Sequence, residues 1–188
     1  MIGVIPEPLL LLILVTISAS IGSFLSVIIH RVPNGESIIK PASHCPKCEE
    51  KINVLDNIPI LSYMLLRGQC RHCREHISLR YPLVEALAVI LTFLIYLVYG
   101  QSSAFLLYTG LAYLLIAITF IDIDHFIIPN GFIVLGLVAL LLALSQGWLP
   151  MHWEDGLNGS LCFAGFLFAM GVIGQFILKK ESIGFGDV

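Results

Sequence analysis

Long apolar runs dominate the sequence, and one long polar segment, residues 30–81, separates the first run from the others. Each run has enough apolar residues to cross the roughly 30 Å hydrocarbon core of a membrane as a helix. The pattern therefore predicts an all-α polytopic membrane protein, a helical bundle with a small cytoplasmic loop domain. The expected spans are residues 9–29, 82–99, 104–121, 131–147 and 159–178.

Composition agrees with this prediction. Hydrophobic residues make up 57% of the 188 residues and charged residues only 12%, whereas soluble domains average about 45–50% and about 25%. Membrane lipid is therefore an expected partner. The formal net charge of −3 is small, and nothing in the sequence resembles a nucleic-acid-binding surface, so no nucleic acid is expected as a partner.

Basic residues predict the orientation of the spans. Eight of the ten lysines and arginines lie between the first and second spans, and the other two follow the fifth. Cytoplasmic loops carry an excess of such residues. We therefore expect segment 30–81 and the C-terminal end inside the cell, and the N-terminus, the 100–103 turn and the 148–158 loop outside.

Two Cys-x-x-Cys pairs lie in the long polar segment, Cys45 with Cys48 and Cys70 with Cys73. Each pair offers two sulfurs from one tight turn, so two pairs complete a tetrahedral Zn²⁺ site. Two disulfides are the alternative, which a reducing cytosol disfavours.

Other potential ligands are less favoured in this segment. The nearby histidines His44, His72 and His76 could substitute as ligands, although four cysteines make ordinary loop histidines the simpler interpretation. With four thiolates the site is closed and structural, leaving no open position for substrate or water. Cys162, in the last span, is interpreted as a small buried hydrophobic residue.

Carboxylates occur at the expected cytoplasmic ends of two spans. The stretch FIDIDHFIIPNG (120–131) contains Asp122 and Asp124, and GFGD (184–187) contains Asp187. Two facing aspartates share a proton, so that one activates a water while the other protonates a peptide carbonyl. Either motif alone is equally typical of a solvated helix end or a turn. Together on one membrane face they favour aspartic-protease chemistry, because ionisable groups there are functional candidates by default.

With these motifs in order, the chain resembles the type IV prepilin peptidases, the GxGD class of aspartyl proteases. The resemblance is carried by GSFLSVIIHRVP (22–33), the tetracysteine loop, residues 57–87, DIDHFIIPN (122–130) and GFGD. It implies a leader peptidase that cleaves prepilins and pseudopilins at the cytoplasmic face of the bacterial inner membrane. It also implies N-methylation of the new N-terminus from S-adenosylmethionine, near the cysteine loop, without indicating which residues bind this cofactor.

The resemblance also organises the chain. Residues 1–29 form the first span, 30–81 the zinc loop, and 82–188 the peptidase core. Members of the family usually continue past GxGD through further helices, so we expect this core to be truncated. Two other classes of function remain as alternatives, a proton-coupled transporter and a non-catalytic scaffold that docks through the zinc loop.

Asp122 and Asp187 are the expected catalytic pair. Residues two apart on a helix point about 200° away from each other, so Asp122 and Asp124 cannot both face Asp187 if the helix persists that far. The family spacing, an aspartate seven residues before the proline of IPN, selects Asp122.

Two charged residues near the start of the second span, Arg80 and Glu85, have a simpler interpretation. We take them as interfacial charges of a helix start that snorkel to the membrane surface. The resemblance places the methylating activity nearby.

Overall fold

The protein is seen here in a computed structural model that describes residues 6–149 and 152–178, with side chains as far as residue 173. Within these ranges the regular elements are helices, and the only β-type pairings are two isolated bridges. The all-α class is therefore confirmed. The elements are α1 (Glu7–Arg31), η1 (Val54–Asn57), α2 (Leu61–Leu65), α3 (Arg80–Tyr99), α4 (Ser103–His125), α5 (Asn130–Ser145) and α6 (Trp153–Leu178).

Four of the described helices, α1, α3, α4 and α6, are long and apolar enough to cross a membrane. Each agrees with an expected span and extends it by one or more residues. The helix expected at 131–147 also forms, as α5, but it has only 16 residues. At 1.5 Å per residue it is about 24 Å long, which is shorter than a typical hydrocarbon core.

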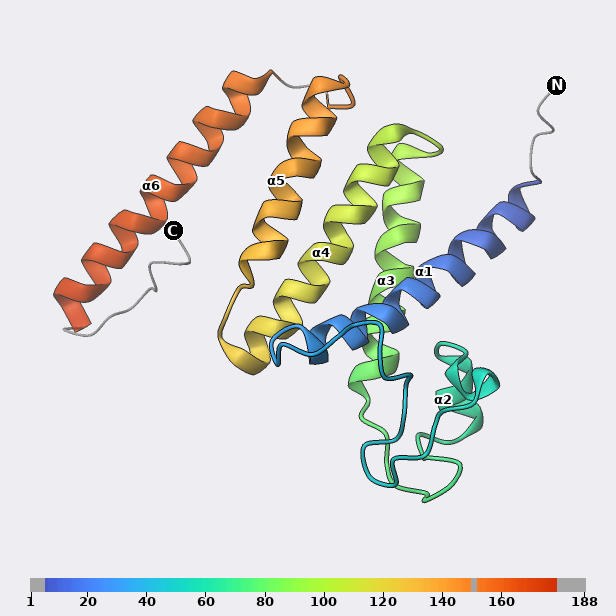
Figure 1. Ribbon diagram of the computed structural model, residues 1–188. Helices are drawn as coiled ribbons and strands as arrows, with labels where there is room; N and C mark the ends of the chain where they lie inside the picture. The colour runs from blue at the N-terminus through green and yellow to red at the C-terminus, as the bar shows by residue number, and fades with distance from the viewer. Residues whose placement is uncertain (1–5, 150–151, 179–188) are drawn as a thin grey trace. The chain divides into compact units, whose positions relative to one another are not determined.

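The chain divides into two compact units, Met1–Gly136 and Leu137–Val188. In the first unit α1, α3 and α4 enclose a common core (Figure 1). Apolar side chains from all three helices meet there and are almost fully buried. They are Leu25, Ile29, Val84, Ala88, Ile116, Ala117 and Ile121.

Small residues bring α1 and α3 unusually close. Ser18, Gly22 and Ser26 recur at four-residue spacing along α1, and two of them, Ser18 and Ser26, are buried polar residues. A Cβ on Gly22 would lie 2.7 Å from the Cα of Glu85. Only a glycine fits this contact, which is the small-residue packing typical of membrane helices.

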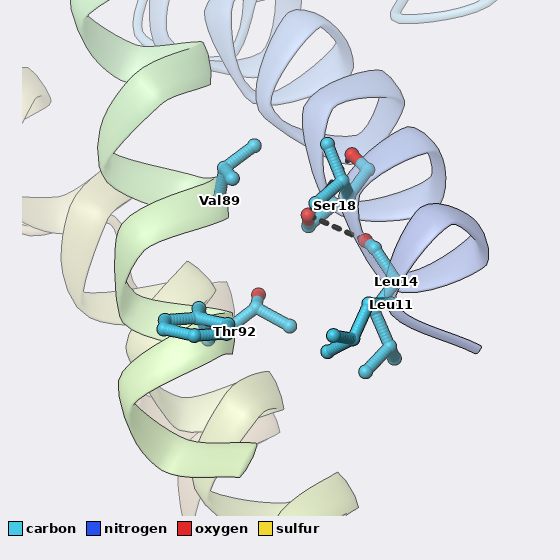
Figure 2. A pocket seen from close by; sticks show the side chains of 7 residues that line it. Leu11, Leu14, Ser18, Val89 and Thr92 are labelled. Carbon is cyan, nitrogen blue, oxygen red and sulfur yellow. Dashed lines mark hydrogen bonds between the residues drawn. The ribbon is translucent and has the colours of Figure 1, made fainter. Parts of the chain in front are cut away.

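An apolar cavity of about 240 Å³ lies further along the same interface, lined chiefly by leucine, valine and phenylalanine side chains (Figure 2). Ser18 faces it, but its hydroxyl already donates to the Leu14 carbonyl, 2.6 Å away. Thr92, which also lines the cavity, has its own hydroxyl bonded to Ala88 and Tyr113. The cavity therefore belongs to helix packing and offers no free polar group for chemistry.

Helices α3 and α4 run antiparallel and are joined by a short turn (Figure 1). Gly100 ends α3 with φ +55°, and Ser102 caps α4 by accepting the Phe105 N–H. At its other end α4 closes at Phe126, which adopts the left-handed conformation and donates its N–H to the Asp122 carbonyl at 2.8 Å. The antiparallel arrangement places the start of α3 beside the end of α4.

The second unit contains α6, whose apolar side chains are largely exposed. Cys162 is exposed together with its neighbours Leu161 and Phe163. The prediction that this cysteine is buried was therefore wrong. A membrane helix can present apolar side chains to lipid instead of to protein, so an apolar sequence alone does not require burial in a core.

Candidate functional site

The two Cys-x-x-Cys segments adopt the same backbone fold. In the first, the Cys45 N–H donates to the Glu50 carbonyl and the Glu49 N–H donates back to the Cys45 carbonyl, both at 2.9 Å. The second repeats this pattern with Cys70, Arg74 and Glu75, at 2.9 and 3.0 Å. The residue after each second cysteine has positive φ, 58° at Glu49 and 57° at Arg74. We call these two segments, 44–51 and 69–76, the knuckles; each is closed by one isolated β-bridge.

The knuckles bring their four sulfurs together. The Sγ atoms of Cys45, Cys48, Cys70 and Cys73 all lie within 4.8 Å of one another. Across the knuckles the Cys45–Cys73 and Cys48–Cys70 sulfur distances are 3.8 and 4.0 Å. These are far beyond the roughly 2.05 Å of a disulfide, and all four cysteines are free. The cluster can hold a metal ion, and no histidine belongs to it among the described residues.

Backbone N–H groups prepare the first thiol of each knuckle for metal binding. The N–H groups of Cys48 and Lys47 stabilise the Cys45 thiolate and lower its pKa to about 7. The N–H groups of Cys73 and His72 lower the pKa of Cys70 in the same way. Because a thiolate is the form that binds a metal, these N–H groups favour the ligating state of Cys45 and Cys70, whereas the pKa values of Cys48 and Cys73 are raised.

An exposed ion pair links the second knuckle to η1. The Arg71 guanidinium makes two contacts with the Asp56 carboxylate, at 2.7 and 2.5 Å. This pairing lowers the pKa of Asp56. The ion pair therefore stabilises the loop at pH values above the ordinary pKa of an aspartate. Its contribution to stability is lost as the pH falls through the lowered pKa of Asp56.

Glu85 attaches the loop to the membrane helices. Its side chain is buried, with 7% of the residue exposed, and its Oε2 accepts the Ile60 N–H at 2.6 Å. Ile60 precedes α2 and has φ +60°, a conformation that a β-branched residue adopts only when its surroundings impose it. The prediction that Glu85 snorkels to the interface was therefore wrong, because the carboxylate has a backbone partner inside the protein.

The helix that carries Asp122 persists beyond it. α4 continues to His125, so Asp122 and Asp124 project from nearly opposite faces, about 200° apart. Asp122 is exposed, and its carboxylate makes no hydrogen bond or ion pair with any residue that the structure describes. Asp187, its expected partner, lies outside the described residues. The carboxylate of Asp122 is thus accessible to a substrate or a second acid.

Asp124 is engaged elsewhere. Its carboxylate forms an ion pair with Arg80, the first residue of α3. Arg80 also donates to the Phe120 carbonyl at 2.7 Å and lies over the Phe120 ring, 5.1 Å from its centroid. Sequence reasoning assigned Arg80 to the interface and missed this contact. The two residues are 44 positions apart, and only the antiparallel packing of α3 on α4 brings them together.

Taken together, these features define a polytopic membrane protein with a loop whose four cysteines could hold a metal ion and an accessible aspartate at the end of a spanning helix. Comparison with known proteins gives the family. Residues 16–99 match the Bacterial Peptidase A24 N-terminal domain, and residues 109–188 match the Type IV leader peptidase family. The chain belongs to the type IV leader peptidase family, as its resemblance predicted.

Individual relatives agree with this assignment. A Prepilin leader peptidase/N-methyltransferase of Myxococcus xanthus is 38% identical over 96% of this chain and 53% of its own length. A Type 4 prepilin-like proteins leader peptide-processing enzyme of Escherichia coli O78:H11 is 38% identical over 89% of this chain and 69% of its own. The chain thus spans about half to two thirds of the relatives' length. No solved structure is significantly similar to it.

Proposed function

We propose that this chain is the catalytic part of a prepilin leader peptidase, with Asp122 and Asp187 as its aspartic-protease pair. One observation carries the proposal. The carboxylate of Asp122 is accessible and has no partner among the residues that the structure describes. It lies in the last turn of α4, inside the segment 109–188 that matches the leader peptidase family and that also contains Asp187. Family membership favours this function over the transporter and scaffold alternatives.

The chemistry follows from two carboxyl groups that share one proton. The ionised carboxylate takes a proton from a water, whose oxygen attacks the carbonyl carbon of the leader peptide bond. The protonated carboxyl donates its proton to the carbonyl oxygen, which gives a tetrahedral diol. The first carboxyl then passes the proton it took from water to the amine nitrogen, and the second carboxylate takes back a proton from the diol as the C–N bond breaks. Asp122 suits such a role because its own helix supplies no cation or hydrogen-bond donor to its carboxylate within the described residues.

The metal that fits the cysteine cluster is Zn²⁺. Tetrahedral Zn–S bonds of about 2.3 Å place neighbouring sulfurs about 3.8 Å apart, and the distances across the knuckles are 3.8 and 4.0 Å. Cys45, Cys48, Cys70 and Cys73 would hold the ion and fill all four positions. Such an ion would be structural, cross-linking the two knuckles without taking part in peptide hydrolysis.

The relatives' names support the proposed substrates and a second activity, and the positions of the basic residues support the proposed orientation. The proposed substrates are prepilins and pseudopilins, whose leader is removed at the cytoplasmic face of the bacterial inner membrane. The loop 30–81 lies inside the cell and the N-terminus outside. The Myxococcus xanthus relative is also named an N-methyltransferase, and methylation of the new N-terminus from S-adenosylmethionine is proposed for this chain as well.

The test is incubation of the purified protein in lipid vesicles with a prepilin, followed by mass spectrometry of the product. The proposal expects a pilin that lacks its leader and, with S-adenosylmethionine present, a product heavier by one methyl group. An intact prepilin, under conditions in which a related peptidase processes it, would contradict the proposed activity.

A further inference from the structure

We propose that Arg80 is a positioning residue of the aspartate site, which fixes the last turn of α4 so that Asp122 is held in the orientation that cleavage requires. This inference rests on the proposed peptidase function. It assigns a role to the start of α3, at the junction between the cysteine loop and the spanning helices.

The contacts of Arg80 lie on both sides of Asp122 along the helix. One guanidinium nitrogen donates to the Phe120 carbonyl at 2.7 Å, and another pairs with the Asp124 carboxylate. Residues 120 and 124 are one turn apart and share a face of α4, from which residue 122 is about 200° away. Arg80 therefore binds the face of α4 opposite to Asp122 and does not contact the Asp122 side chain.

The contacts of Arg80 are supported by packing on both helices. The Arg80 guanidinium also lies over the Phe120 ring, 5.1 Å from its centroid. One turn along α3, Val84 is fully buried, and Ile121 of α4 is fully buried in the same core cluster. Arg80 and Asp124 have 31% and 34% of their side-chain surface exposed, so their pairing is partly shielded from solvent and from salt.

The charges are unfavourably placed for their own helices. A cation at the start of α3 and an anion at the end of α4 each oppose the dipole of the helix that carries them. Each becomes favourable only beside the other helix, since Arg80 lies at the negative end of α4. The stability of each helix alone therefore does not account for Arg80 and Asp124. An ion pair that sets the relative position of the two helix ends does account for them.

The αL cap completes the support of Asp122. The Phe126 N–H donates to the Asp122 carbonyl at 2.8 Å, so the cap fixes the backbone of Asp122 from the C-terminal side while Arg80 fixes the preceding turn. Catalysis depends steeply on such orientation, because a shift of about 1 Å at a reacting group can cost about 10²-fold in rate.

The experiment compares prepilin cleavage by Arg80→Ala, Arg80→Lys and Asp124→Asn in lipid vesicles. We expect Arg80→Ala to lower kcat by about 10²-fold with KM nearly unchanged, because orientation and not substrate binding is lost. Lysine supplies the charge but cannot make both contacts at once, so Arg80→Lys should recover part of kcat. Asp124→Asn keeps the Phe120 contact and should lose less than Arg80→Ala. The control is Arg67→Ala, which removes an exposed arginine of the loop and should leave kcat unchanged.

A second measurement tests the distance between positions 122 and 187 without using enzyme activity. Cysteines replace Asp122 and Asp187 in a Cys162→Ala background, and a short bifunctional thiol reagent links them; a chain with Asp122→Cys alone gives the background from the knuckles. We expect rapid linking that slows at least several-fold when Arg80→Ala is added. Absence of linking with Arg80 present would refute the aspartate pairing itself. Equal linking rates with and without Arg80, or a wild-type kcat in Arg80→Ala, would refute the positioning role.

Discussion

At the scale of single residues, the structure separates charged side chains that look alike in the sequence. Asp122 and Asp124 are two positions apart, yet the first carboxylate is unpartnered among the described residues and the second is paired with Arg80. Glu85 is buried and bound to a backbone N–H of the loop. Acidic residues near a membrane surface therefore differ in role according to their partners and not according to their depth alone.

Glu85 gives a prediction at this scale. Glu85→Ala removes the acceptor of the Ile60 N–H and should destabilise the docking of the loop by about 1–3 kcal/mol, the cost of an unsatisfied buried donor. Glu85→Gln keeps an oxygen acceptor and should cost less. Limited proteolysis of segment 30–81 measures the effect, and Glu50→Ala, at an exposed loop position, serves as the control. Unchanged protease resistance in Glu85→Ala would contradict an anchoring role.

The same variant tests a catalytic role for Glu85, because the resemblance places methyl transfer near this part of the chain. Wild-type rates of both cleavage and methylation in Glu85→Ala would exclude such a role. A loss of methylation that exceeds the loss of loop stability, with cleavage retained, would support one.

At the scale of elements, the sequence predicts which helices form better than it predicts which helices contact each other. The apolar runs locate every described long helix, and the cysteine spacing predicts the cluster that Cys45 and Cys73 form across two knuckles. The burial of Glu85 could also have been predicted, since it lies three residues before Ala88 and shares a face of α3 with it. The pairing of Arg80 with Asp124 was not, because local pattern carries no information on which helix ends meet.

The packing of α1 on α3 gives a prediction for these two elements. Gly22→Ala would place a methyl group 2.7 Å from the Glu85 backbone, which must push the helices apart and cost about 1–3 kcal/mol. Gly110 in α4 is the matched control, because a Cβ there meets nothing within 4 Å, and alanine is the better helix former. We expect a lower thermal unfolding temperature in detergent for Gly22→Ala only. Equal temperatures would contradict the close approach.

The knuckles give a second prediction for elements. Cys45→Ser, or serine at Cys48, Cys70 or Cys73, should reduce bound zinc and the yield of folded protein, because three thiolates no longer complete the tetrahedron. Cys162→Ser, at an exposed cysteine outside the cluster, should retain both. Metal analysis of the purified proteins measures the zinc that each variant retains. Wild-type protein without zinc, or stoichiometric zinc after a double cysteine replacement, would refute the assignment.

At the scale of the whole molecule, orientation connects the basic residues to the site. Eight of the ten lysines and arginines lie in segment 30–81, which predicts that the loop and the end of α4 lie on the cytoplasmic side. A cysteine at Gln101, in the turn between α3 and α4, should then react with an impermeant thiol reagent added outside intact cells. A cysteine at Glu36 should react only after permeabilisation. The reverse labelling pattern would overturn the topology.

The central claim is that Asp122 and Asp187 together hydrolyse the leader peptide bond while Asp124 supports them. The most direct measurement is the prepilin cleavage rate of Asp122→Asn, Asp124→Asn and Asp187→Asn, each in lipid vesicles beside the wild-type protein. The account predicts no cleavage in the first and third variants and a measurable rate in Asp124→Asn. Retained methylation of a precleaved substrate would show that the inactive variants are folded. Full cleavage by Asp122→Asn together with its loss in Asp124→Asn would contradict the account.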